Sequence, residues 1–330
     1  MQRRIIRSFL IAAAMFLFPN LAPAPLIYTP GEGWRYEPVG GEGGWVRRRA
    51  KDQLEVAQTA FENKDYNLAA RAARRTVSQW PFSDYAGQAQ YLLGRSYEAK
   101  GQDERAFKAY QTLIERYPKV DNYDEVIKRQ HIIANRFLAG QWFKLWNYVP
   151  AFPSMDKTIK LYNQIIKNGP YSEVAPHAQM NIGQAHENKI VTDYTAAVKA
   201  YETAADRYSD QPVGIDALYK VGLTYNKQAG RAEYDQSIAT QAMSTFTDFA
   251  TLFPNDPRVS DAQKRIDALK TEQARGSFDI AQFYERKNRL RAAQIYYNDV
   301  LDKDPNSKYA EAARERLQAI NRRPEQHASQ

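Results

Sequence analysis

The sequence predicts an all-α protein in which pairs of helices repeat along the chain. The first observation is that small and large residues recur at one fixed spacing. Three copies fit this spacing without a gap: Gly94, Tyr97, Ala106, Tyr110, Leu113 and Pro118; Ala281, Tyr284, Ala293, Tyr297, Val300 and Pro305; and Ala57, Ala60, Ala69, Ala73, Thr76 and Pro81. The second observation is that strand signals are scarce from residue 46 onward, whereas alanines recur at helical spacing.

This spacing is typical of two antiparallel helices joined by a tight turn. Gly94 and Ala106 are small and let the helices approach closely, Tyr97 and Tyr110 fill the groove between neighbours, and Pro118 ends the second helix. It is the pattern of the tetratricopeptide repeat, a helical pair of about 34 residues. Three further pairs fit with longer turns, around Gly183 and Tyr201, Gly222 and Phe246, and Ala134 and Tyr162. We therefore expect a tetratricopeptide-repeat solenoid of about six helical pairs over residues 46–320, in which residues 309–320 form a capping helix.

The N-terminal residues 1–24 resemble a secretory signal. Three arginines precede an apolar run over residues 9–18, and small residues follow at Ala22 and Ala24. Because Pro25 would hinder cleavage after Ala24, an uncleaved N-terminal anchor is the alternative. Residues 25–45 are rich in glycine and proline and are expected to form a linker without helix or strand pairing, and residues 321–330 a disordered tail.

The composition excludes several kinds of chemistry. The 330 residues carry a formal charge of +8 and contain no cysteine, which excludes disulfides, thiolate metal sites and a cysteine nucleophile. The four histidines form no metal or catalytic pattern, and no glycine-rich phosphate loop follows a strand. We therefore expect no catalytic residues, no metal and no cofactor. The basic charge is compatible with nucleic acid, but the export signal argues against such a partner.

The long turn of the third pair, residues 139–153, is the main departure from the repeat. It contains Trp142, Phe143 and Trp146 in a connection that would normally be polar. Exposed aromatic residues mark a site for a partner or for a membrane interface, so these three are candidate partner-binding residues. The alternative is that the loop folds into a small core of its own. Tyr91 and Arg95, on a first helix, are candidates for a peptide-binding groove.

Three stretches resemble the outer-membrane protein assembly factors of the BamD (ComL-like) type. They are the alanine-rich segment at 66–85 that ends in an aromatic-proline-phenylalanine sequence, the segment at 279–305, and the aromatic insertion after Asp121-Asn122-Tyr123. The lipid-bearing cysteine of that family is missing, so no lipid anchor is carried over, and the pairs at about 171–254 look like additional repeats.

The resemblance implies a non-catalytic periplasmic scaffold at the inner face of the outer membrane, attached through a partner or the N-terminal anchor. Its partners would be an outer-membrane β-barrel assembly protein and unfolded barrel substrates. The N-terminal repeats would bind peptide, and the C-terminal repeats the barrel-forming partner. On this basis Trp80, Pro81, Phe82 and Tyr85 are the expected peptide-binding residues, and Phe283, Tyr284, Arg286 and Arg289 the expected partner-binding residues. A different periplasmic repeat scaffold, which coordinates cell-envelope or export complexes, is the alternative.

Overall fold

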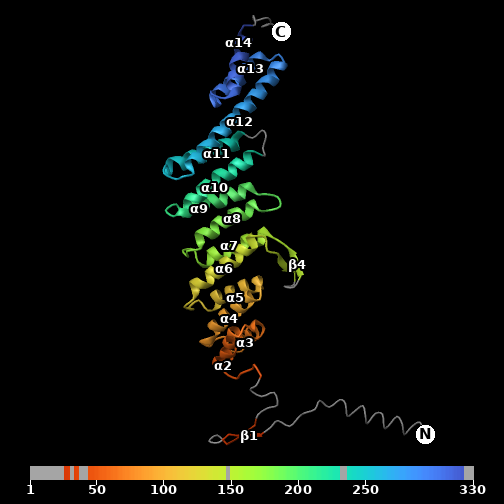
Figure 1. Ribbon diagram of the computed structural model, residues 1–330, viewed down its shortest axis with the longest axis vertical. Helices are drawn as coiled ribbons and strands as arrows, with labels where there is room; N and C mark the ends of the chain where they lie inside the picture. Colours follow the sequence, from red (N-terminus) through yellow and green to blue (C-terminus); the bar gives the residue numbers. More distant parts are fainter. Residues whose placement is uncertain (1–25, 30–32, 37–43, 146–148, 231–235, 323–330) are drawn as a thin grey trace, which may run out of the picture. The chain divides into compact units, whose positions relative to one another are not determined.

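The computed structural model describes residues 26–29, 33–36, 44–145, 149–230 and 236–322, and helices dominate this part of the chain (Figure 1). The chain divides into two compact units, Met1–Asp121 and Asn122–Gln330. The predicted all-α repeat class is confirmed, since the thirteen helices of the described residues form six successive pairs and one additional C-terminal helix. The predicted signal at 1–24 and residues 323–330 of the predicted tail lie outside the described residues.

Unit 1 contains two helical pairs. They are α2 (Ala50–Glu62) with α3 (Tyr66–Gln79), and α4 (Tyr85–Ala99) with α5 (Asp103–Arg116). The side chain of Asp65 starts α3, because its Oδ1 accepts a hydrogen bond from the backbone N–H of Leu68 at 3.0 Å. Lys64 and Gly101 adopt positive φ in the turns inside the two pairs, and this left-handed conformation reverses the chain after each first helix.

The expectation that residues 25–45 pair with no strand is wrong. Strands β1 (Leu26–Thr29) and β2 (Gly33–Tyr36) form an antiparallel hairpin in which Leu26 faces Tyr36 and Thr29 faces Gly33. The prolines and glycines that prompted the expectation fall mostly outside these eight residues, whose isoleucine, tyrosines and tryptophan favour strands.

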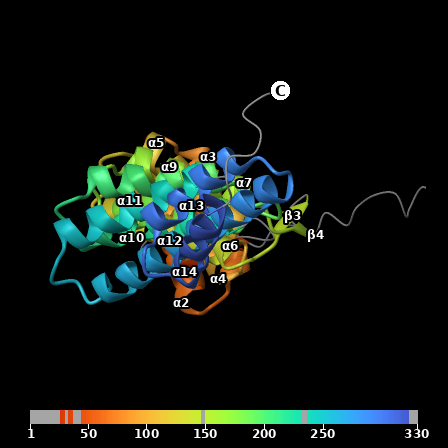
Figure 2. The same cartoon turned by 90° about the horizontal axis from the view of Figure 1, so that it is seen from above.

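Unit 2 contains four helical pairs and the last helix. They are α6 (Tyr123–Leu138) with α7 (Met155–Asn168), α8 (Ala175–Glu187) with α9 (Tyr194–Arg207), α10 (Pro212–Ala229) with α11 (Gln236–Leu252), α12 (Val259–Arg286) with α13 (Leu290–Lys303), and α14 (Lys308–Asn321). The aromatic insertion between α6 and α7 forms a second hairpin, β3 (Phe143–Leu145) with β4 (Val149–Phe152). This hairpin projects from the side of the helices in both views (Figures 1 and 2).

The small and large residues of the repeat meet as predicted. A Cβ atom added to Gly94 would lie 2.4 Å from the ring of Tyr110, and one added to Gly183 would lie 2.4 Å from the ring of Tyr201. Gly222 and Phe246 repeat this contact at 2.7 Å. The glycine therefore leaves the space into which the ring of the second helix fits.

Helix α12 is 28 residues long, about 42 Å at the rise of an α-helix. Its first half packs on α11 through Ala262 and Ile266, and its second half packs on α13 and α14 through Ala281. A single continuous helix thus belongs to two successive layers of unit 2. Among the described residues, none of the helices is long and apolar enough to span a membrane.

Candidate functional site

Polar residues that the repeat spacing does not include join the helices of two pairs, α4 with α5 and α12 with α13. The hydroxyl of Tyr110 donates a hydrogen bond to Glu98 at 2.8 Å, and that of Tyr297 donates to Glu285 at 2.8 Å. In both pairs the glutamate follows the small residue by four positions, so it lies on the same helix face. A buried glutamine recurs four positions before the small residue, and the side chain of Gln90 donates to the carbonyl of Ala109 at 2.8 Å. The signal was present in the sequence as a glutamine-glycine-glutamate pattern at spacings of four.

A cavity of about 570 Å³ lies in unit 1, between the first turn of α2 and the turn that leads into α4. Phe82 and Tyr85, two of the predicted peptide-binding residues, line it. Phe82 is 100% exposed, so its ring is available to a ligand. The other walls are mostly charged: Arg49, Lys51, Asp52, Glu55 and Asp84. An apolar ring beside charged groups of both signs suits a peptide that carries both kinds of side chain.

The other two residues at this turn support it. Trp80 and Pro81 are half-buried and do not line the cavity. The hydroxyl of Tyr117 donates to the carbonyl of Pro81 at 3.0 Å, which ties the turn to the end of α5. Burial raises the pKa of the Tyr117 hydroxyl against the lowering effect of Arg116, so this donor stays protonated at neutral pH. These two residues therefore hold the turn that presents Phe82.

Tyr91 and Arg95 lie further along α4 and form one cluster with Phe61 of α2. The guanidinium carbon of Arg95 lies 5.3 Å from the ring centre of Phe61 and 5.8 Å from that of Tyr91, and its Nη1 donates to the Tyr91 hydroxyl at 3.1 Å. Ten residues of α4 separate Tyr85 from Arg95, about 15 Å along the helix. Phe61 was not among the predicted residues, and it reaches this cluster from α2 through its contact with Arg95. The α2–α4 surface, defined by Phe82, Tyr85, Phe61, Tyr91 and Arg95, thus combines an apolar end and a cationic end.

The insertion divides its aromatic residues between packing and exposure. Phe143 is only 3% exposed and its ring stacks on Phe137 of α6 with centres 4.1 Å apart. The Nζ of Lys157 in α7 also lies 5.0 Å from the centre of the Phe143 ring. Trp142 is 53% exposed, and Trp146 lies outside the described residues. The hairpin therefore has a small core against α6, and among the side chains of the insertion that the structure describes Trp142 is an exposed aromatic one.

The C-terminal candidates lie around the turn between α12 and α13. Phe283 is 49% exposed, and Tyr284 stacks on Tyr296 with ring centres 5.5 Å apart and planes at 8°. Arg286 and Arg289 are both exposed. Four further residues at this turn were not predicted: Lys287, Arg291, Ile295 and Tyr296. The Nζ of Lys287 lies 6.0 Å from the centre of the Phe283 ring. The α12–α13 surface, defined by Phe283, Tyr284, Arg286, Lys287, Arg289, Arg291, Ile295 and Tyr296, joins apolar rings to four cations.

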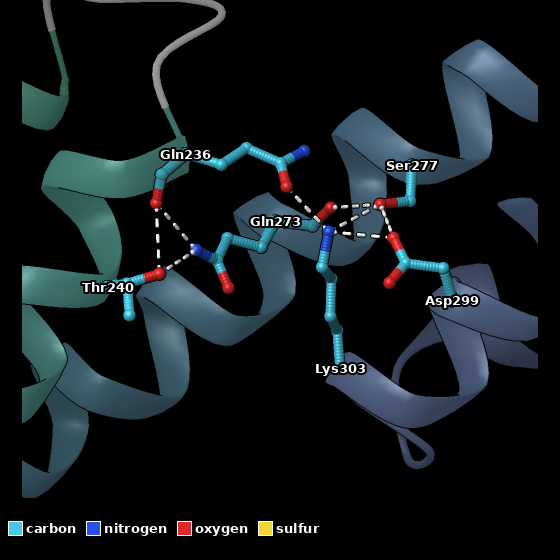
Figure 3. Close-up of polar contacts among 6 residues, drawn as sticks. All are labelled: Gln236, Thr240, Gln273, Ser277, Asp299 and Lys303. Carbon is cyan, nitrogen blue, oxygen red and sulfur yellow. Dashed lines mark hydrogen bonds and ion pairs between the residues drawn. The ribbon is translucent and has the colours of Figure 1, made fainter.

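A polar network behind this surface holds α11, α12 and α13 together (Figure 3). Lys303 donates to Gln236 at 2.6 Å and to Ser277 at 2.8 Å, and it pairs with Asp299 at 2.7 Å. The side chain of Gln273 donates to the backbone carbonyl of Gln236 at 3.1 Å. Burial alone would raise the pKa of Asp299. The hydrogen bonds from Lys303 and Ser277 and the charge of Lys303 together outweigh burial, so the pKa is lowered. The network keeps the α12–α13 surface in one arrangement.

The start of α12 is fixed by a second charged group. The Arg258 guanidinium pairs with Asp256 at 2.8 Å and with Asp216 of α10 at 2.7 Å, and it lies 5.1 Å from the ring centre of Tyr219. Hydrogen bonds from Arg258 lower the pKa of the Asp256 carboxyl to about 2, despite partial burial. Asp256 is therefore charged, and paired, over the whole physiological pH range.

Comparison with known families agrees with the resemblance that the motifs predict. Residues 170–329 match the family model described as "Outer membrane lipoprotein" (YfiO), and residues 88–119 match a tetratricopeptide repeat model. The pairs at 171–254 lie within the family match, so the expectation that they are additional repeats is wrong.

Three curated relatives are outer membrane protein assembly factors named BamD. The chain is 22% identical over 162 residues to that of Caulobacter vibrioides, which covers 49% of the chain and 52% of the relative. It is 26% identical to that of Rickettsia prowazekii, with 44% of this chain and 57% of the relative covered. It is 24% identical to that of Haemophilus influenzae, with 47% of this chain and 62% of the relative covered. The chain thus spans between half and about three fifths of the length of these relatives.

Solved structures of repeat proteins are also similar. A repeat protein of Cytophaga hutchinsonii is 15% identical, with 80% of this chain and 87% of that chain covered and a TM-score of 0.37. YrrB, described as a TPR protein with an unusual peptide-binding site, is 12% identical, with 66% and 92% covered and a TM-score of 0.34. The predicted resemblance to BamD-type assembly factors is therefore confirmed by the family match over residues 170–329 and by the three curated relatives.

Proposed function

We propose that this protein is a non-catalytic periplasmic scaffold for the assembly of outer-membrane β-barrel proteins. The observation that carries the proposal is the match of residues 170–329 to the outer membrane lipoprotein family, whose curated relatives are assembly factors. The export signal predicted at 1–24 is consistent with a place in the periplasm at the inner face of the outer membrane. A partner or the N-terminal anchor would hold it there.

The α2–α4 surface of unit 1 is the proposed site for unfolded barrel substrates. The distance of about 15 Å between its two ends corresponds to about five residues of an extended peptide. An aromatic side chain of the peptide would contact Phe82 and Tyr85 at the apolar end. A carboxylate of the peptide would pair with Arg95, which Phe61 and Tyr91 already hold in place.

The α12–α13 surface of unit 2 is the proposed site for the barrel-forming partner. Phe283 and Ile295 supply exposed apolar area, and the four cations of residues 286–291 favour an acidic rim on the partner. Trp142 on the insertion is a second contact, since it is the exposed aromatic residue of the β3–β4 hairpin that the structure describes.

The peptide site is tested by crosslinking in native envelopes with a photoreactive residue placed at position 82. We expect crosslinks to unfolded barrel proteins. Tyr171 supplies the matched control, because it is equally exposed and occupies the equivalent turn of unit 2, proline-aromatic-serine in both. Equal capture of barrel proteins from positions 82 and 171 would remove the case for a specific site in unit 1.

The partner site is tested by affinity capture from membranes with the full chain and the pair Phe283→Ala and Arg286→Ala. We expect the double variant to lose the barrel-forming partner, whereas Leu252→Ala, which removes exposed apolar area from α11, keeps it. Capture of wall-synthesis or export proteins in place of barrel proteins would favour the alternative periplasmic scaffold.

A further inference from the structure

Two asparagines on neighbouring first helices of unit 2 form a small polar platform. Asn135 belongs to α6 and Asn181 to α8, and both are half-buried. The Nδ2 of Asn181 donates to the Oδ1 of Asn135 at 2.9 Å. From α7, the hydroxyl of the fully buried Tyr162 donates to the same Oδ1 at 2.6 Å. In this arrangement the Asn135 oxygen accepts both hydrogen bonds, which leaves its Nδ2 turned away from Asn181 and Tyr162.

This arrangement leaves one donor and one acceptor without a partner among the described residues. The Nδ2 of Asn135 points away from its occupied oxygen, and the Oδ1 of Asn181 points away from its donating nitrogen. Neither atom is sealed inside the protein, so both can reach a ligand. A hydrogen-bond donor beside an acceptor is the complement of one residue in an extended chain, whose own N–H and carbonyl point to the same side.

The two titratable side chains that contact the platform, His131 and Tyr162, are uncharged at neutral pH. The Nε2 of His131 lies 3.4 Å from the Nδ2 of Asn181, and its ring centre lies 5.9 Å from that of Tyr162. Burial, with a smaller contribution from His177, lowers the pKa of His131 to about 4, so its ring is neutral and Nε2 can accept. Burial also raises the pKa of Tyr162, which therefore remains a donor. A neutral platform favours a neutral ligand over an anion or a cation.

We propose that Asn135 and Asn181 bind the backbone of one residue in an extended chain segment, with the Asn135 amide donating to the carbonyl of that residue and the Asn181 carbonyl accepting from its N–H. Such a site recognises the main chain and tolerates many side chains. Main-chain hydrogen bonds play the same part when a peptide strand adds to the edge of a sheet. Because Tyr162 orients the amides before binding, little side-chain entropy is lost. This site lies in unit 2 and is additional to the α2–α4 surface of the proposed function.

The test uses a library of random twelve-residue peptides selected on the full-length chain and counter-selected on Asn135→Asp. This variant keeps an oxygen that accepts from Tyr162 and Asn181, replaces the outward donor with a second acceptor and adds one negative charge. Counter-selection discards peptides that bind elsewhere, including unit 1. Gln184→Glu is the matched control, since it adds the same charge three residues beyond Asn181 on α8.

We expect peptides of diverse sequence whose affinity, measured by fluorescence anisotropy, falls about tenfold with Asn135→Asp and stays within twofold with Gln184→Glu. N-methylation of one peptide bond in a selected peptide should cause a similar loss, because it removes the N–H that Asn181 accepts. Thermal unfolding checks the fold, and Asn181→Ala repeats the test from the other helix if Asn135→Asp melts early. The proposal is overturned by a library that yields no such peptide, by equal losses in the control, or by tolerance of N-methylation at every position.

Discussion

Substitution of Gly94 by alanine tests whether the close contact between the two helices of a pair stabilises unit 1. The added Cβ would lie 2.4 Å from Cε1 and 2.6 Å from Cδ1 of Tyr110, a side chain with 0% exposure. Carbon atoms in ordinary contact are about 3.5 Å or more apart, so the ring has to retreat by about 1 Å. That movement also strains the hydrogen bond from the Tyr110 hydroxyl to Glu98.

The expected cost follows from these contacts. Overpacking of a tight core costs about 1–3 kcal/mol, and a weakened hydrogen bond adds about 1 kcal/mol. Alanine is favoured over glycine inside a helix by about 1 kcal/mol, which offsets part of this cost. We therefore expect Gly94→Ala to lower the free energy of unfolding by about 1–3 kcal/mol.

The assay is urea unfolding followed by circular dichroism, with Gly276→Ala as the matched control. At Gly276 the new Cβ would lie 3.4 Å from the flexible amide of Gln236, so the helix preference should dominate and stability should rise by up to about 1 kcal/mol. In a Tyr110→Ala background the clash is gone, and Gly94→Ala should become stabilising by a similar amount. A destabilisation that persists in that background would refute the reasoning, as would wild-type stability of Gly94→Ala alone.

Two further predictions concern unit 2. We expect Asp256→Asn to lower the free energy of unfolding at pH 7 by about 1 kcal/mol. The folded pKa of about 2 lies below the unfolded value near 4, and screening by solvent keeps the effect below the ~2.7 kcal/mol that two pKa units would give. This contribution is present above about pH 4 and is lost as the pH falls through 2, so urea titrations of variant and wild type should converge there; a constant difference from pH 7 to pH 2 would contradict it. We also expect Phe143→Ala to destabilise by about 3 kcal/mol and Trp142→Ala by less than about 1 kcal/mol in urea titrations, because the first ring is buried and the second half exposed. Equal effects of the two substitutions would mean that the hairpin has no core on α6.

The repeat architecture was accessible to sequence reasoning because it depends on side-chain size at fixed spacing. Gly183 with Tyr201 and Gly222 with Phe246 reveal it even where the turns between helices are longer than in the Gly94 and Tyr110 pair. The two hairpins were not accessible in the same way. Glycine and proline near β1 and β2 argued against pairing, whereas pairing depends on the short segments between them. The burial of Phe143 depends on Phe137, a contact that residue type alone does not reveal.

The candidate sites were predictable only in part, because a surface is formed by residues from several elements. Phe82 and Tyr85 are neighbours in sequence and were found together, but Phe61 joins Arg95 only through the packing of α2 on α4. The Asn135 and Asn181 platform combines residues 46 positions apart. Each asparagine alone is an ordinary polar residue on a helix, and only the hydrogen bond between them shows which of their atoms remain available.

The unbroken course of α12 has a mechanical consequence. A helix resists bending, and α12 contains no proline and runs as one continuous helix through its Gly276-Ser277 pair. Its first turns are clamped by Arg258, and its far end carries Phe283. A partner that pulls on Phe283 therefore exerts a torque on the layer of α10 and α11 about 36 Å away, by the rise of 24 residues. Helix α12 thus acts as a lever that transmits a force applied at Phe283 to helices α10 and α11.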